Sequence, residues 1–228
     1  MNFVDKNLET CNNFIFLGEA GSGKSEIAIN FAIYLKKHTK KEVHFFDMDM
    51  TKPLFRSRDL EKELSDLNIV MHYEKQFMDA PTIVGGVRRN LKNRDAYVVM
   101  DIGGDYMGAR AIGGFASEIN KDNCLTYYVV NPYRPWSTNI EGIDKVLSSI
   151  LGVSHVKIDK VKIVSNPNLG ISTTLDDIII GNEKVFEMIG EYKPIEFLCV
   201  SKNIYSDVIG KVSSEVFPID LFLTYPWE

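Results

Sequence analysis

Near the start of the chain stands the stretch Gly18-Glu19-Ala20-Gly21-Ser22-Gly23-Lys24-Ser25, a complete G-x-x-x-x-G-K-S phosphate-binding loop. An apolar run over 14–17 precedes it, and an amphipathic run with apolar residues at spacings of four follows it. In a strand–loop–helix context the glycines let successive N–H groups point inward, and the new helix directs its positive end at the same place. The pattern predicts a phosphate site from Gly18 to Glu26, in which Lys24 reaches the β- and γ-phosphates and the Ser25 hydroxyl ligates Mg²⁺.

Strand-like and helical stretches alternate along the whole chain. This rhythm predicts an α/β fold of three layers, with a mostly parallel, doubly wound sheet between helices. The expected strands lie near 12–17, 42–47, 68–73, 96–101, 124–130, 160–165 and 194–200. The expected helices lie near 23–37, 54–66, 81–93, 107–119, 138–150, 174–189 and 203–212. No repeat or linker interrupts the pattern, so we expect one P-loop nucleotide-binding domain over 1–228, with the apolar tail 216–223 packed back on it.

Local signals predict the ends of the helix near 138–150. Thr138 and Glu141 have the spacing of a capping box, which would begin the helix. Gly152 follows its expected end and suits a C-terminal cap.

Composition limits the class of protein. With 228 residues, of which 45% are hydrophobic and 25% charged, the chain is an ordinary globular sequence. A formal net charge of −5 disfavours nucleic acid as a partner, and no apolar run approaches the roughly 18 residues of a membrane span. The sequence opens without a signal peptide, and its three separated cysteines suit a reducing compartment, so we expect a cytoplasmic protein. The scattered cysteines and histidines disfavour a zinc site.

Two acidic residues close the second expected strand. Asp47 and Asp49 are two positions apart, so on an extended chain their side chains face the same way. The carboxyl ends of the strands gather around the ligand in a doubly wound sheet. We therefore expect Asp47 and Asp49 to face the phosphates and to take part in catalysis, with Asp47 also near the metal.

A third carboxylate closes the strand near 96–101. Four apolar residues followed by Asp101 are typical of the magnesium-side strand of phosphate-loop proteins. Gly103 and Gly104 would let the backbone approach the γ-phosphate closely. Asp105 is either a helix cap or a group that supports the site from behind.

Together these motifs resemble the MinD/ParA-like group of the SIMIBI phosphate-loop nucleotide hydrolases, the CobQ/CobB/MinD/ParA nucleotide-binding fold. The resemblance covers almost the whole chain and implies ATP and Mg²⁺ as ligands. It implies that Asp47 touches the water shell of magnesium, that Asp49 orients the attacking water, and that 101–104 form a second switch. It also places Asn166 and Pro167 where an asparagine reads adenine, although an Asn-Pro turn explains the same residues.

The chain departs from this group at Glu19, where dimeric members carry a signature lysine. A glutamate cannot stabilise a partner's phosphates. Either a cation of the loop after Asp49 substitutes, which would be Lys52, Arg56 or Arg58 beside Thr51, or turnover is slow, or the dimer mechanism does not apply. Each of these cations is also readily explained as a surface residue. The basic C-terminal membrane helix of some relatives is missing too.

A weaker resemblance links the loop and 103–105 to metallochaperone GTPases. Their N-K-x-D guanine motif has no equivalent here, since the best-placed segment reads Asn166-Pro167-Asn168-Leu169. Adenine is therefore favoured.

We expect a Mg²⁺-dependent ATP-binding protein, an ATPase that reports its nucleotide state to a protein partner of undetermined identity, with a homodimer left open. One alternative is a small-molecule kinase or ATP-dependent ligase of the dethiobiotin-synthetase type, whose acceptor pocket would be built from 68–94 and 107–115. Another is a nucleotide-gated adaptor that does not hydrolyse ATP.

Overall fold

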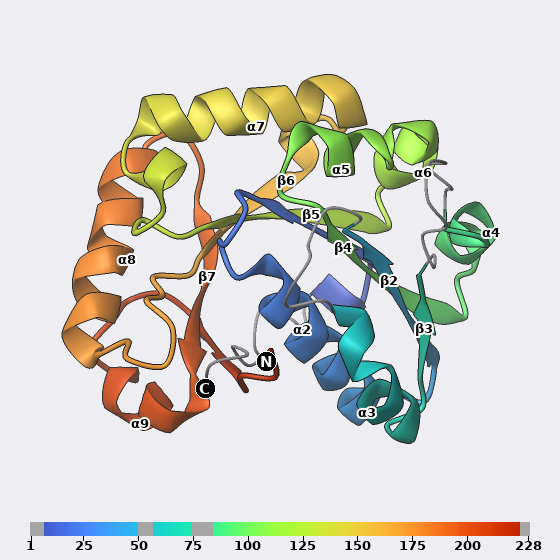
Figure 1. Cartoon of the computed structure of the whole chain (residues 1–228), viewed down its shortest axis with the longest axis horizontal. Coiled ribbons are helices and arrows are strands. Elements are labelled where there is room, and N and C mark those ends of the chain that lie inside the picture. Colours follow the sequence, from blue (N-terminus) through green and yellow to red (C-terminus); the bar gives the residue numbers. More distant parts are fainter. Residues whose placement is uncertain (1–6, 50–56, 74–83, 224–228) are drawn as a thin grey trace.

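A single eight-stranded sheet runs through the computed structural model, which describes residues 7–49, 57–73 and 84–223. All its neighbouring strands pair in parallel, in the order β3-β2-β4-β1-β5-β6-β7-β8 (Figure 1). The strands are β1 (Asn13–Gly18), β2 (Glu42–Met48), β3 (Ile69–His72), β4 (Ala96–Ile102), β5 (Cys124–Val130), β6 (Val161–Ser165), β7 (Ile195–Ser201) and β8 (Val216–Ile219). The seven expected strands are confirmed, each to within a residue or two.

Helices cover both faces of this sheet, which confirms the three-layer α/β/α class (Figure 1). On one face lie α2 (Lys24–His38) and α3 (Glu61–Asp66). On the other lie α4 (Val87–Lys92), α5 (Tyr106–Arg110), α6 (Ala116–Ile119), α7 (Ile140–Ser154) and α8 (Leu175–Ile189), with α9 (Tyr205–Val208) beside α8. Short 3₁₀ turns join them: η1 (Ser57–Leu60), η2 (Gly113–Phe115), η3 (Pro135–Ser137), η4 (Ile158–Lys160) and η5 (Lys202–Ile204).

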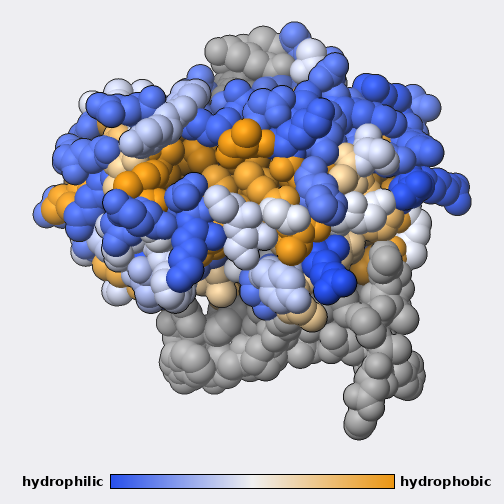
Figure 2. Space-filling model, turned by 90° about the horizontal axis from the view of Figure 1, so that it is seen from above, coloured by the Kyte–Doolittle hydropathy of each residue, from blue (hydrophilic) through white to orange (hydrophobic). Residues whose placement is uncertain are grey.

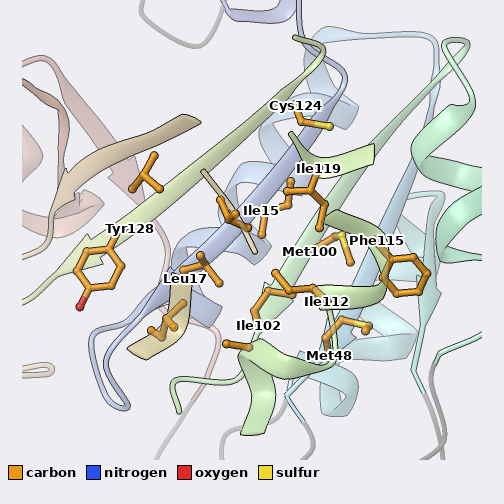
Figure 3. Packing of buried hydrophobic residues seen from close by; sticks show 14 of the residues in the cluster. Ile15, Leu17, Met48, Met100, Ile102, Ile112, Phe115, Ile119, Cys124 and Tyr128 are labelled. Atoms are coloured by element: carbon orange, nitrogen blue, oxygen red, sulfur yellow. The ribbon is translucent and has the colours of Figure 1, made fainter. Parts of the chain in front are cut away.

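Strand β1 shows why the sequence folds this way. It is buried on both faces, as an apolar run in a parallel sheet should be. Phe14 and Phe16 point toward α2, where the Phe14 ring lies 4.8 Å from that of Phe31. Ile15 and Leu17 point to the opposite side and join the cluster under α5 and α7 (Figure 3). Each such side chain contributes about 1.5–3 kcal/mol by leaving water, so β1 holds the phosphate loop on a rigid base.

Several helices are shorter than the sequence pattern predicts. The expected helix 107–119 is divided into α5, η2 and α6, because Gly113 and Gly114 interrupt it and glycine weakens a helix interior. The expected helix 203–212 ends at Val208, since Gly210 adopts a φ of 83°.

The predicted ends of the helix near 138–150 are wrong. Helix α7 begins after Asn139, whose side chain accepts a hydrogen bond from the Gly142 N–H at 2.8 Å, and not after Thr138. It continues through Gly152 to Ser154, and its C-cap His155 adopts a left-handed φ of 56°. The capping box lies instead at the start of α8, between Thr174 and Asp177.

The tail packs back on the body, as predicted, but it does so as the edge strand β8. Pro218 lies within this strand, and proline is tolerated at a sheet edge because no N–H is needed there.

Seen from the side of α5, α6 and α7, the surface is largely hydrophilic, with apolar residues gathered near its centre (Figure 2). Among the helices that the structure describes, none combines the length and the apolar character that a bilayer crossing requires.

Candidate nucleotide site

The phosphate loop turns sharply into α2 at Gly23. This residue has a φ of 90°, and a side chain here would meet the Asn166 amide nitrogen at 2.2 Å. The same amide donates a hydrogen bond to the Ser22 carbonyl oxygen at 2.7 Å. Asn166 thus supports the loop from below, and only glycine fits above it.

A buried ion pair lies at the start of α2. The Lys24 side chain is 1% exposed, and its Nζ lies 3.8 Å from Oδ2 of Asp49. Asp49 is held in turn, since its backbone N–H donates to Oδ1 of Asp47 at 3.0 Å. A buried charge is costly unless it is paired, and here the ammonium and the carboxylate pair with each other. The two contacts together bring Lys24, Asp49 and Asp47 to one place, and the sequence assigns all three to catalysis.

Asp47 and Asp101 are paired neighbours on β2 and β4. Parallel strands lie about 4.8 Å apart, so two carboxylates meet at the carboxyl edge of the sheet. Oδ2 of Asp101 accepts a hydrogen bond from the Ser57 hydroxyl at 2.9 Å. Within the described part of the chain, its Oδ1 is buried and accepts none. This edge thus has the oxygen donors that Mg²⁺ prefers.

The donors present fit a magnesium ion only in part. Among the described residues, no group of three or more His, Cys, Asp or Glu side chains is arranged to hold a metal. Asp101 and Asp47, together with the buried Ser25 at the start of α2, would need phosphate oxygens or water to complete an octahedral shell. That is the usual way in which proteins bind Mg²⁺ with a nucleotide.

Gly103 and Gly104 bring the loop after β4 against the phosphate loop. A side chain on Gly104 would meet the backbone N of Ala20 at 2.6 Å. A side chain on Gly103 would meet Oδ1 of Asp49 at 3.2 Å. Asp105 is a helix cap, because its Oδ1 accepts the Gly108 N–H at 2.7 Å.

Glu19 points into its own domain. Its side chain is buried, and the two carboxylate oxygens accept hydrogen bonds from the Trp136 N–H at 3.1 Å and the Ser137 hydroxyl at 2.8 Å. At the position where the dimeric relatives carry a signature lysine, this chain therefore has a glutamate that bonds to residues of its own chain. Arg134 adds a second contact to the loop, since its Nε donates to the Gly21 carbonyl at 2.8 Å.

Glu26 was expected to contact the nucleotide, but its carboxylate binds the C-terminal segment. It accepts hydrogen bonds from the backbone N–H groups of Phe222 and Leu223. Burial raises the pKa of Glu26 to about 7, and the nearby Asp220 carboxylate adds to the rise. Only the backbone of Glu26 is therefore left to face a nucleotide.

The segment after β6 contacts the phosphate loop, α8 and Asn131. Pro167 packs against Gly181 of α8, where any side chain would meet the proline at 2.4 Å. Asn168 is fixed by Asn131, whose Nδ2 donates to the Asn168 carbonyl at 2.8 Å. The contact of Asn166 with the phosphate loop gives this residue a structural role beside the predicted reading of adenine.

Some partners in this site could not be found from sequence patterns. Ser57, Arg134 and Ser137 belong to no motif, and their contacts join segments far apart in the chain. The predicted cation loop cannot be placed: Thr51, Lys52 and Arg56, and the side chain of Arg58, lie outside the described residues.

Solved structures with the same fold include three proteins of low sequence identity. FtsY from Thermotoga maritima matches with a TM-score of 0.54 at 15% identity, over 86% of this chain and 68% of that one. Chloroplast FtsY from Physcomitrella patens matches at 0.52 and 15%, over 82% and 58%. FlhF, in a complex with GTP and Mg²⁺, matches at 0.52 and 14%, over 82% and 65%. The chain spans between 58% and 68% of the length of these three proteins.

A search of curated proteins gave no significant match. A family profile does match: residues 14–167 fit the CobQ/CobB/MinD/ParA nucleotide binding domain, over more than half of the 228 residues. This range contains the phosphate loop, both acidic strand ends and Asn166. The chain therefore belongs to the CobQ/CobB/MinD/ParA nucleotide-binding family of SIMIBI-class P-loop NTPases.

Proposed function

We propose that this protein binds ATP with Mg²⁺ and hydrolyses it, and that its nucleotide state acts as a switch on a protein partner. The observation that carries the proposal is the buried edge of β2 and β4, where Lys24, Asp49, Asp47 and Asp101 lie together next to the phosphate loop. Charges buried at this density are unfavourable for folding alone and are typical of functional sites. The three free cysteines are buried, which supports a place in the cytoplasm.

The chain's own groups suggest the division of work. Backbone N–H groups of the loop and the ammonium of Lys24 would bind the phosphates. Asp49, held by its contact with Asp47, would orient the attacking water. Ser25, Asp47 and Asp101 would hold Mg²⁺, which when bound supplies positive charge beside the phosphates. Catalysis would then be positioning plus charge stabilisation.

ATP is proposed over GTP because the segment at the base end has no carboxylate. A guanine-specific pocket needs an acceptor for two N–H donors of the base, and in the segment Asn166-Pro167-Asn168-Leu169 the apolar Leu169 stands at that position. The Asn168 side-chain oxygen also already accepts the Gly170 N–H at 2.6 Å. The complex of FlhF with GTP and Mg²⁺ supports a magnesium nucleotide in general.

Phosphate release tests this function. The wild type is expected to release phosphate from Mg-ATP faster than from Mg-GTP, and Asp49→Asn to lower the rate by roughly 100-fold. Asp144→Asn, on an exposed carboxylate of α7, is the matched control and should leave the rate unchanged. Equal rates for wild type and Asp49→Asn would contradict the assigned role of Asp49.

The internal contact of Glu19 favours a second candidate, a nucleotide-gated adaptor without hydrolysis. This position supplies no cation here, whether to its own site or to that of a partner. Saturable ATP binding with no phosphate release, alone or with any added partner, would select this candidate over the ATPase.

A further inference from the structure

Residues 131–137, which begin the connection between β5 and α7, are hydrogen-bonded to two residues of the phosphate loop, Glu19 and Gly21. Trp136 and Ser137 donate hydrogen bonds to the Glu19 carboxylate at 3.1 and 2.8 Å. The Nε of Arg134 donates to the Gly21 carbonyl at 2.8 Å. We call these residues the 131–137 segment.

The other side of Glu19 faces the loop that follows β4. A methyl group on Gly104 would lie 2.9 Å from the carbonyl carbon of Glu19 and 2.6 Å from the backbone N of Ala20. The two backbones are thus closer than one added carbon atom permits. A phosphate oxygen that entered between them would have to move the Glu19–Ala20 peptide or the Gly104 peptide.

The 131–137 segment also contacts the loop after β6 and two helices, α7 and α8. Asn131 holds the loop after β6 through the carbonyl of Asn168, and the Tyr133 hydroxyl donates to the Asp177 carbonyl of α8 at 2.6 Å. The Trp136 carbonyl packs against Gly142 in the first turn of α7, where a side chain would meet it at 2.5 Å. A shift of the 131–137 segment would therefore change its contacts with both α7 and α8.

Trp136 lies at the outer side of this segment. Its side chain is 53% exposed, and the Lys145 ammonium lies over its ring at 5.3 Å from the centroid. Its backbone N–H is one of the two donors to Glu19. A single hydrogen bond therefore links the residue that carries the exposed ring to the phosphate loop.

We propose that Glu19 is a positioning residue that transmits the nucleotide state of the phosphate loop to the 131–137 segment and to Trp136. Glu19 is 5% exposed, and loss of its hydrogen bonds from Trp136 and Ser137 would leave a buried charge unpaired, which is strongly unfavourable. When nucleotide moves the Glu19–Ala20 peptide, the donors should move with the carboxylate. This inference rests on the proposed nucleotide site and adds to it a route to the surface on the α7 side.

Tryptophan fluorescence tests the inference directly. The chain has two tryptophans, so Trp227→Phe leaves Trp136 as the sole reporter. In this background, a non-hydrolysable Mg-ATP analogue is expected to change the emission of Trp136, and Mg-ADP to change it less. Ser137→Ala removes one donor to Glu19 and should reduce the response at least twofold, although the nucleotide still binds. Thr138→Ala is the matched control, since this exposed hydroxyl contacts the Pro135 carbonyl instead and should keep the full response.

Coupling is reciprocal, which gives a second readout. If the segment and the nucleotide bias each other, Glu19→Gln should change the ratio of ATP to ADP affinity by roughly fivefold or more, and Thr138→Ala should not change it. Hydrogen exchange of the 131–137 amides, measured in the wild type with and without Mg-ATP, gives the same information without Trp227→Phe. Protection that changes in the wild type and no longer changes in Ser137→Ala would support the coupling.

The outcomes separate this inference from the function on which it rests. Absence of saturable nucleotide binding would contradict the proposed function. Saturable binding with no change in Trp136 emission or in exchange of the 131–137 amides would overturn only the positioning role of Glu19. An undiminished response in Ser137→Ala and Glu19→Gln would overturn it as well.

Discussion

The two ends of the central strands both bury polar side chains, but of different kinds. At the amino end the buried groups are neutral amides: Asn12 donates to the Asn93 and Ala96 carbonyls at 2.7 and 3.1 Å, and accepts from the Asn123 side chain at 2.8 Å. At the carboxyl end the buried groups include a lysine and three aspartates. The same sheet thus carries an uncharged polar cluster at one edge and a charged one at the other.

This difference separates stability from function. Neutral amides that bond to nearby carbonyls satisfy the backbone and hold strand ends and loops together. Buried charges are expensive to desolvate, and an edge that keeps several of them, one with an unpartnered oxygen among the described residues, is prepared for a charged ligand. Substitutions at the amino end should therefore lower stability, and those at the carboxyl end should lower ligand binding.

The largest effect is expected at the charged edge. Lys24→Ala should weaken Mg-ATP binding roughly 100-fold, because it removes charge-assisted bonds to the phosphates. In the wild type, ATP at 100 times its dissociation constant should stabilise the fold by about 2.7 kcal/mol. Melting curves with and without Mg-ATP should show this stabilisation in the wild type, and only about 0.4 kcal/mol in Lys24→Ala at the same concentration.

Lys41 provides the control for that experiment. It lies near the amino end, is exposed, and donates to the Arg94 carbonyl at 3.0 Å. Lys41→Ala should keep the full nucleotide-dependent stabilisation. Equal losses in the two lysine variants would show that the charged edge is not special.

The next effect is one of stability at the neutral edge. Asn12→Ala should lower the free energy of unfolding by about 2–4 kcal/mol, because it leaves one buried and one partly buried carbonyl without this donor. Urea unfolding measures this loss. Asn90→Ala, at an exposed amide of α4, should cost much less. Nucleotide affinity that falls with Asn12→Ala in the still-folded protein would contradict the separation of roles.

A smaller, pH-dependent effect is expected at a third polar contact, where His44 Nδ1 lies 2.9 Å from His72 Nε2. Burial and the neighbouring His44 lower the pKa of His72 from 6.5 to about 4. Between these values the unfolded chain binds more protons than the folded one, so the free energy of unfolding falls as the pH falls from 6.5 toward 4. This pair should contribute on the order of 1–2 kcal/mol to that fall after allowance for solvent screening.

His72→Gln should remove this contribution, because glutamine stays neutral. Urea unfolding at pH 7 and pH 4.5 should therefore show a smaller loss of stability in His72→Gln than in the wild type. The exposed His38 offers a matched control, and His38→Gln should lose as much stability as the wild type. An unchanged pH dependence in His72→Gln would mean that the pair titrates as it does in the unfolded chain.

The frame of the molecule could be predicted because its signals are local. Strand β5 is predicted at its observed bounds, 124–130, since a mostly apolar run bounded by polar residues is typical of a buried parallel strand. The phosphate loop and Asp101 follow from residues at fixed spacing. Helices 107–119 and 203–212 were overestimated because glycines end helices in ways that apolar periodicity does not reveal.

The contacts that complete the site are not local, and the sequence does not reveal them. Glu19 meets Ser137 and Glu26 meets Leu223, which lie 118 and 197 positions away along the chain. Which of two acidic residues binds a distant backbone depends on how the loops fold over the strand ends. The strand β8 was missed for a related reason, since four residues with a central proline give little strand signal until they pair with β7.

Equilibrium titration of the wild-type protein with nucleotide tests the account most directly. We predict saturable binding of Mg-ATP and Mg-ADP at one site per chain, weakened when EDTA removes the metal. Titrations with ATP, GTP and their diphosphates that show no saturable binding in the presence of magnesium would contradict the central claim, that the charged edge of this sheet is a nucleotide site.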